Sequence, residues 1–230
     1  MSKLTLGYWK IRGLAEPIRI LLHYLEIDYK EDLYEFGPAP DFNLDSWFNV
    51  KFKLGLDYPN VPYLFDEDFK LTESGAILRY ICGKYKPELL GETLKEKAIV
   101  DMSVGVLWDL RNAKARLMYQ GKDFQGSEGF KKAMKDKLTY FNNFLGKNKF
   151  LAGDKITYPD FLLVETLESI NDFLEPALEE FPNLKRHFET ICEIPSIKKY
   201  RAKRELCLIM EELLNLVVKL KNKYIIIINY

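Results

Sequence analysis

The sequence contains little cysteine and no excess of either charge, and each shortage excludes a class of protein. Its three cysteines, Cys82, Cys192 and Cys207, lie far apart, so they match neither a metal-binding spacing nor a disulfide framework. Its 34 Lys and Arg residues are balanced by 34 Asp and Glu residues, whereas nucleic-acid binding needs a basic excess. We therefore expect a protein of a reducing compartment that holds no metal and binds no nucleic acid.

Long hydrophobic runs are also missing. No segment approaches the about 20 apolar residues that cross a membrane, and the final YIIIINY is far too short. The first residues, MSKLTL, have no apolar core of signal-peptide length. The composition is nevertheless 47% hydrophobic, which is enough for one large or two small domains with cores of their own. These features predict a soluble cytoplasmic protein without a membrane partner.

The most informative stretch that is present is residues 57–85. After Pro62, two short apolar runs flank an acidic turn, which predicts a β-hairpin over 63–65 and 69–72. A helix follows with Ser74 at its N-terminus. Its apolar stripe consists of Ile77, Leu78, Ile81 and Cys82. Free amides and a partial positive charge make such a terminus a carboxylate site, although an ordinary capped helix after a hairpin has the same pattern.

The residues before this stretch alternate between strand and helix patterns. Strands are predicted over 3–9 and 29–34, with an apolar-striped helix between them that begins at Pro17. A strand, a helix and a strand in this order form a parallel unit of fixed handedness. A further helix is predicted over 45–53. Together with the hairpin, these elements predict a four-stranded mixed sheet with helices on its faces.

The second part of the chain has only helix patterns. Residues 86–91 are a linker with Pro87 and Gly91 as breakers, and Thr157 with Asp160 forms a capping box at one helix start. The predicted helices span 94–118, 127–145, 157–173, 183–194, 196–205 and an amphipathic 206–217. The fold class is therefore α/β plus all-α, with an α/β domain at 1–85 and an all-helical domain at 92–230.

Five segments in register resemble the cytosolic glutathione S-transferases, and above all their mu class. They are GYWKIRGLAEPIR, APDF, WFNVKFKLGLDYPNVPYL, the pair Glu73-Ser74 with GAILRY, and GDKITYPDF. The resemblance covers roughly residues 3–200. It implies a thioredoxin-like N-terminal domain, a helical-bundle C-terminal domain that forms the hydrophobic substrate site, a homodimer, and glutathione as cosubstrate without any further cofactor.

Tyr8 aligns with the catalytic tyrosine of that family. The thiol of glutathione is mostly protonated near neutral pH, because a free cysteine has a pKa of about 8.5. A phenol hydroxyl at the end of the first strand can donate to the thiolate, and such a bond contributes roughly 1.5–3 kcal/mol, or one to two pKa units. The thiolate then attacks an electrophilic carbon. Without the motif, Tyr8 would be an ordinary aromatic core residue.

The resemblance also implies a cradle along the tripeptide. Ser74 and its helix amide hold the γ-glutamyl carboxylate, and Val61 bonds the cysteinyl backbone if its peptide to Pro62 is cis. Trp47 and Lys51 hold the glycyl carboxylate through an indole N–H and an ammonium. The expected glutathione contacts are Tyr8, Trp9, Leu14, Trp47, Lys51, Asn60, Val61, Pro62, Glu73, Ser74 and Asp109, the last of which reaches the glutathione of the other subunit.

Four positions carry further expectations from the resemblance. Glu73 stands where mu enzymes usually carry Gln, and its carboxylate can pair with the α-ammonium of glutathione. Leu44 occupies a position where Arg is common, which predicts weaker glutathione binding. Tyr119 aligns with a tyrosine that assists some electrophiles at the second-substrate site. Tyr58 aligns with the aromatic key of the dimer, although it could also fold back onto its own domain.

Conjugation of glutathione to hydrophobic electrophiles, a detoxification reaction, is the function that the resemblance implies. The departure at Leu44 and the divergent segment beyond about residue 203 leave two alternatives open. One is a non-catalytic carrier of apolar ligands on the same fold. The other is a specialised glutathione-dependent isomerase or peroxidase that uses the same thiolate.

Overall fold

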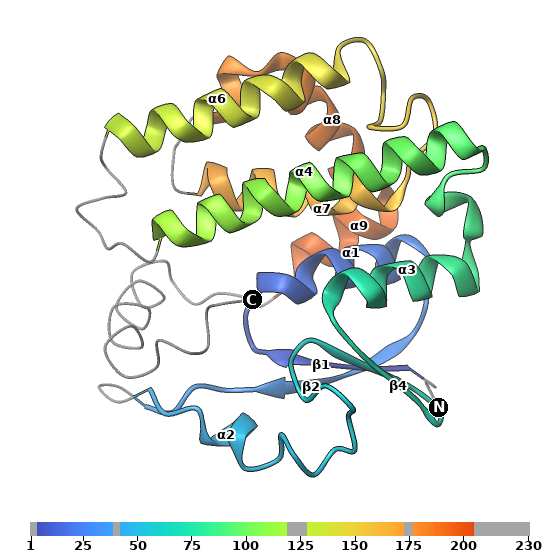
Figure 1. Cartoon of the computed structure of the whole chain (residues 1–230), viewed down its shortest axis with the longest axis vertical. Coiled ribbons are helices and arrows are strands. Elements are labelled where there is room, and N and C mark those ends of the chain that lie inside the picture. The colour runs from blue at the N-terminus through green and yellow to red at the C-terminus, as the bar shows by residue number, and fades with distance from the viewer. Residues whose placement is uncertain (1–3, 39–41, 119–127, 173–176, 205–230) are drawn as a thin grey trace. The chain divides into compact units, whose positions relative to one another are not determined.

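The computed structural model describes residues 4–38, 42–118, 128–172 and 177–204 (Figure 1). The chain divides into two compact units by its internal contacts. Of the described residues, the first unit contains those up to Pro87 together with 195–204, and the second contains those from Glu88 to Ile194. The domain bounds expected from the sequence, 1–85 and 92–230, stay a prediction, and the contacts add a segment near the C-terminus to the first unit.

A four-stranded mixed sheet forms the centre of the first unit, as predicted. Its strands are β1 (Leu4–Trp9), β2 (Tyr29–Tyr34), β3 (Tyr63–Asp66) and β4 (Phe69–Thr72), in the order β2-β1-β3-β4. β1 runs parallel to β2 and antiparallel to β3, and β3 runs antiparallel to β4. The hairpin of β3 and β4 therefore lies where the sequence pattern put it.

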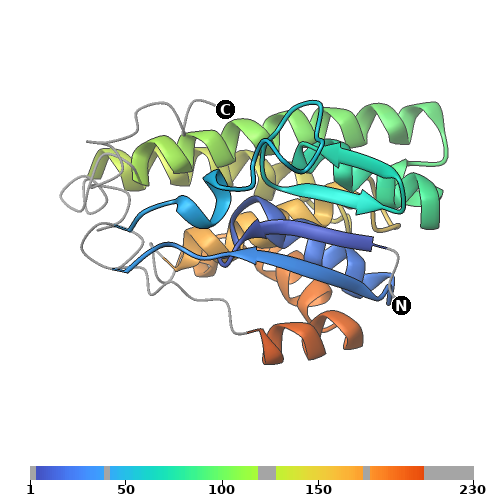
Figure 2. The same cartoon turned by 90° about the horizontal axis from the view of Figure 1, so that it is seen from below.

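Helices cover the sheet of this unit on both sides. α1 (Glu16–Tyr24) and α3 (Ser74–Tyr85) lie together on one face, whereas α2 (Asp45–Phe48) lies on the other (Figures 1 and 2). The short 3-10 helix η1 (Gly13–Ala15) precedes α1, and α9 (Pro195–Lys203) packs against α1. The predicted stripe of α3 is buried, so the apolar periodicity identified the face that meets the sheet.

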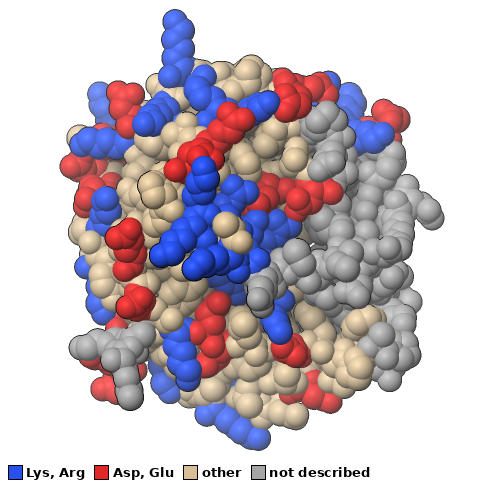
Figure 3. Space-filling view, turned by 180° about the vertical axis from the view of Figure 1, so that it is seen from behind, with Lys and Arg blue, Asp and Glu red and all other residues tan. Residues whose placement is uncertain are grey.

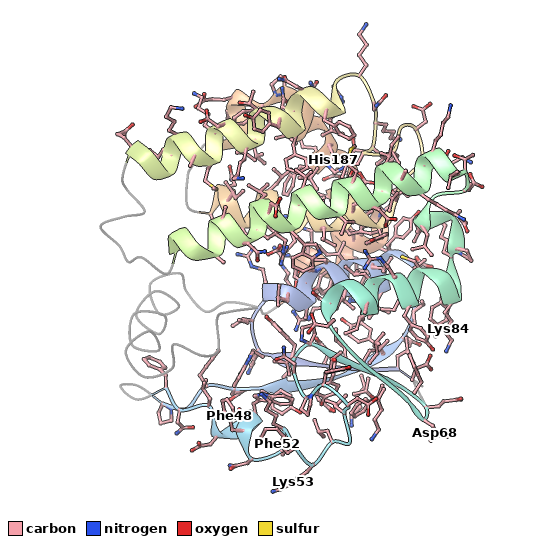
Figure 4. The ribbon with its side chains drawn as sticks, viewed as in Figure 1. Phe48, Phe52, Lys53, Asp68, Lys84 and His187 are labelled. Atoms are coloured by element: carbon pink, nitrogen blue, oxygen red, sulfur yellow. The ribbon has the colours of Figure 1, made fainter. Side chains whose placement is uncertain are left out.

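The helix predicted over 45–53 is much shorter in the structure. α2 ends at Phe48, and turns follow in which the Val50 and Lys53 amides bond to carbonyls three residues back. The Trp47 side chain packs into the core with Leu56 and Tyr63, so tertiary packing overrides the local helix pattern. Phe48 and Phe52 remain exposed along this segment (Figure 4).

The second unit is helical. Its elements are η2 (Pro87–Leu90), α4 (Leu94–Met118), α6 (Glu128–Leu145), α7 (Tyr158–Asn171), η3 (Ala177–Glu180) and α8 (Pro182–Cys192). α7 is buried along nearly its whole length and packs on α4 and α8. The predicted capping box is present, because Thr157 and Asp160 bond each other's backbone amides at the start of α7.

Two expectations fall on residues that the structure does not describe. The amphipathic helix predicted over 206–217 and the second-site Tyr119 both lie outside the described residues. Within the described ranges, none of the helices combines the length and the apolar character needed to cross a membrane. Acidic and basic side chains are mixed across the face drawn in Figure 3, around one gathering of basic side chains, in keeping with the balanced composition.

Candidate active site

Tyr8 lies near the end of β1, beside Leu33 of β2, and only 6% of it is exposed. Its hydroxyl oxygen accepts a hydrogen bond from the backbone N–H of Leu14, with 3.0 Å between nitrogen and oxygen. A phenol hydroxyl can both accept and donate hydrogen bonds. The turn after β1 therefore fixes the position of the Tyr8 hydroxyl oxygen.

Gly13 makes the close approach of Tyr8 to this turn sterically feasible. Its φ is +46°, and a Cβ at this position would lie 2.6 Å from the Tyr8 hydroxyl oxygen. We expect Gly13→Ala to displace the hydroxyl and to lower kcat/KM about tenfold, because a shift of 1 Å in a catalytic group has large effects on rate. Steady-state kinetics of a glutathione conjugation assay would measure the loss.

Gly146 offers a matched control for this substitution. Its φ is +48°, but the nearest atom to an added Cβ is the Asn143 carbonyl oxygen at 3.4 Å. Gly146→Ala therefore introduces similar backbone strain far along the chain from Tyr8, and it should lower stability while kcat/KM is retained. Equal loss of kcat/KM in the two variants would contradict the role of Gly13.

The N-terminus of α3 has the geometry of an anion site. Glu73 is exposed and has a φ of 71°, a strained conformation for a residue with a side chain, and Ser74 behind it is buried. Strain of this kind persists mainly where function requires it. Glu73 joins the end of β4 to the start of α3. The first backbone amides of a helix precede its own hydrogen-bonding pattern, so those of α3 can bind a carboxylate.

The loop before β3 brings three further predicted contacts together. The peptide between Val61 and Pro62 is cis, which is the condition on which the expected role of Val61 depends. Asn60 is exposed, Val61 is half-buried, and Pro62 is buried at the start of β3. Asn60 and Val61 are therefore accessible to a ligand beside the sheet.

An aromatic cluster that the sequence analysis did not predict packs between α2 and the sheet. Trp47 is 3% exposed and packs on Tyr34 and Tyr63, with ring centroids 5.0 and 6.2 Å away. The two tyrosine hydroxyls lie 2.8 Å apart, and that of Tyr63 donates to Asp32 over 3.1 Å. Burial raises the pKa of both Tyr34 and Tyr63, so both stay neutral. Trp9 stacks on Phe36 at the edge of this cluster.

Lys51 supplies a cation on the same side of the sheet. Its ammonium lies 5.5 Å from the ring centroids of Phe48 and of Phe52, which is within the range of a cation–π interaction. Leu44 is buried, and its carbonyl accepts the amides of Trp47 and Phe48 at the start of α2. Position 44 therefore contributes a backbone cap and no charge.

The remaining predicted residues lie elsewhere. Tyr58 is 79% exposed in the loop between α2 and β3. Asp109 is exposed on α4 and belongs to the second unit. Across the described parts of both units, no group of three or more His, Cys, Asp or Glu side chains could hold a metal ion.

Comparisons with known proteins agree with this architecture. Residues 4–83 match the family model "Glutathione S-transferase, N-terminal domain", and residues 108–204 match "Glutathione S-transferase, C-terminal domain". The chain is 45% identical over 199 residues to Glutathione S-transferase Mu 1 of Bos taurus, covering 86% of this chain and 89% of the relative. It is 44% identical over 196 residues to Glutathione S-transferase Mu 7 of Rattus norvegicus, with 85% and 88% covered.

A solved structure is similar as well. The Pi-class glutathione S-transferase of Onchocerca volvulus superposes with a TM-score of 0.75 at 29% identity, covering 88% of this chain and 94% of that one. The four-stranded mixed sheet of the first unit and the family match of residues 4–83 are those of a thioredoxin-like domain. The chain belongs to the glutathione S-transferase family, and its relatives place it with the mu class.

Proposed function

We propose that the protein conjugates the thiolate of reduced glutathione to hydrophobic electrophiles, with Tyr8 as the catalytic residue. The observation that supports this best is the buried Tyr8 hydroxyl near the end of β1, whose oxygen is held by the Leu14 amide. A hydrogen bond from this hydroxyl stabilises the thiolate relative to the thiol and lowers the thiol pKa. At neutral pH more of the bound glutathione is then in the nucleophilic form.

The rest of the site binds the tripeptide along its length. The Ser74 hydroxyl and the first amides of α3 bind the γ-glutamyl carboxylate, and the carboxylate of Glu73 pairs with the α-ammonium. Val61 bonds the cysteinyl backbone, and Lys51 binds the glycyl carboxylate with the Trp47 indole beside it. Because Leu44 brings no charge, Lys51 is the principal cation for that carboxylate. Trp9, Leu14, Asn60, Pro62 and Asp109 complete the proposed contacts.

The second substrate is a hydrophobic electrophile bound by the helical domain, where Tyr119 assists. Glutathione is the cosubstrate, and the reaction needs no metal or prosthetic group, because the thiolate itself is the nucleophile. We place the enzyme in the cytoplasm, where glutathione and reduced cysteines occur together.

The proposal is tested by assaying one preparation for conjugation of a chloronitrobenzene and for retention on immobilised glutathione. The enzyme should do both. Retention without conjugation across a broad screen of electrophiles and peroxides would contradict catalysis and favour a carrier of apolar ligands. Turnover restricted to peroxides or to isomerisation would retain the thiolate but overturn the substrate class.

Tyr58 carries the prediction about assembly. We propose a homodimer in which the exposed Tyr58 side chain enters a pocket of the partner, because a large aromatic anchor in a loop is otherwise unfavourable in water. A two-fold interface is self-complementary, so Tyr58→Ala removes two anchors. Each anchor contributes about 2 kcal/mol or more, so loss of both should raise the dimer dissociation constant by about three orders of magnitude in sedimentation experiments.

The control for this variant is Tyr140→Ala. Tyr140 is a similarly exposed tyrosine on α6 that has no proposed role in assembly. The Tyr140→Ala variant should sediment as the same dimer as the wild type. Wild-type protein that sediments as a monomer at micromolar concentration, or a Tyr58→Ala dimer of unchanged affinity, would contradict the proposed anchor.

A further inference from the structure

A buried ionic cluster lies beneath the turn that fixes Tyr8. Arg19 of α1 is fully buried, and its guanidinium donates to the carbonyl oxygens of Ile11 and Arg12 over 2.9 and 3.2 Å. It also donates to Glu31 of β2 over 2.6 Å and to Glu16 over 3.3 Å. Burying a charged arginine away from water costs free energy, and these hydrogen bonds and ion pairs offset that cost for Arg19.

The two carbonyls that Arg19 binds belong to the turn that carries the Tyr8 donor. Arg12 precedes Gly13 and Leu14, and its carbonyl also accepts the backbone amide of Glu16, 3.0 Å away. The Leu14 amide that donates to Tyr8 thus lies between two fixed points, the Arg12 carbonyl before it and the start of α1 after it. The guanidinium therefore holds the carbonyls of the turn directly before the Leu14 N–H.

α9 completes the cluster from the other end of the chain. The Tyr200 hydroxyl donates to Glu16 over 3.0 Å, and Arg204, directly after α9, donates to the second oxygen of Glu16 over 2.8 Å. The ring of His23 stacks on that of Tyr200, with centroids 4.2 Å apart. Glu16 is fully buried, so it depends on these donors and on Arg19 for its charge compensation.

We propose that Arg19 is a positioning residue for Tyr8, and that Tyr200 and Arg204 hold Glu16 so that α9 helps to set the pKa of bound glutathione. The inference rests on the proposed function of Tyr8. A phenol that accepts a well-directed N–H is polarised into a stronger donor, because hydrogen bonds in a chain strengthen one another. Loss of the Leu14 bond weakens the donation from Tyr8 to the thiolate, and the thiol pKa rises.

The test is the pH dependence of kcat/KM, together with ultraviolet titration of the bound thiol, in two variants of the full chain. Arg19→Lys keeps the charge but cannot bind both carbonyls and Glu31 at once. Tyr200→Phe combined with Arg204→Met removes both contacts from the α9 region to Glu16. Each should raise the thiol pKa by about half a unit, which lowers kcat/KM about threefold at acidic pH and leaves it near wild type at alkaline pH.

The matched control is Tyr24→Phe combined with Lys86→Met. It removes another tyrosine hydroxyl and another cation that contact each other at α1, away from Glu16. It should leave the thiol pKa unchanged. A merely structural role would lower kcat/KM equally at every pH, so a uniform loss, or an unchanged pKa in the Tyr200→Phe, Arg204→Met variant, overturns the inference.

Tyr8→Phe in the same experiment separates this inference from the proposed function. It should raise the thiol pKa by more than any of the other variants. If it does so while the Arg19 and α9 variants resemble the wild type, the proposed function stands and the positioning role fails. If Tyr8→Phe itself leaves the thiol pKa unchanged, the proposed function and the positioning role are both overturned.

Discussion

Replacing Tyr8 with Phe is expected to lower kcat/KM about 10- to 100-fold near neutral pH while glutathione still binds. The substitution keeps the ring in its buried place on β1 and removes only the hydroxyl that the Leu14 amide orients. A hydrogen bond to a charged group contributes about 1.5–3 kcal/mol, and each 1.36 kcal/mol corresponds to a tenfold change. Kinetics with a chloronitrobenzene and a separate glutathione-binding measurement distinguish the two effects.

Tyr80→Phe is the control for loss of a tyrosine hydroxyl in the same unit. The Tyr80 hydroxyl, on α3, donates to Asp66 over 2.6 Å. Its removal should lower stability slightly and leave kcat/KM close to that of the wild type. Tyr8→Phe turnover equal to that of the wild type would rule out the assigned role of Tyr8.

Gly7→Ala is expected to have the largest effect on stability. Gly7 pairs with Tyr63 across β1 and β3, and an added Cβ would overlap the Tyr63 ring. That ring is fully buried, and its hydroxyl is fixed by Tyr34 and Asp32, so it has little room to move. Overpacking of this kind costs about 3 kcal/mol, which should lower the melting temperature by about 6–12 °C.

Two further variants isolate the cause. Gly105→Ala, in α4, meets no atom within 4 Å and should be neutral or slightly stabilising, because alanine favours the helix. Tyr63→Leu placed in the Gly7→Ala background removes the obstructing ring and should recover part of the loss. A Gly7→Ala protein that melts with the wild type would contradict the packing described here.

Local sequence patterns were sufficient to predict most of the secondary structure and the sheet. The hairpin after Pro62 and the buried face of α3 follow from residues that are neighbours in sequence, because strand and helix periodicity expresses which face is buried. The capping box at the start of α7 could also be predicted from the sequence, because Thr157 and Asp160 are one helical turn apart. The functional residues came from the resemblance, because an isolated tyrosine or Trp-Lys pair carries no such information.

Long-range packing explains what the sequence did not predict. The helix pattern in the sequence continues past Phe48, whereas α2 ends at Phe48 and the Trp47 side chain packs into the core. The contact between Arg204 and Glu16 joins residues 188 positions apart, which no local pattern can express. The strained φ of Glu73 is likewise imposed by the junction between β4 and α3, since its residue type does not favour it.

The most direct test of the central claim is titration of the thiol of bound glutathione, followed by the ultraviolet absorbance of the thiolate, in the wild type and in Tyr8→Phe. We expect a wild-type thiol pKa about one to two units below the free value of about 8.5, and a return towards that value in Tyr8→Phe. The same lowered pKa in both proteins would show that a group other than Tyr8 activates the thiol.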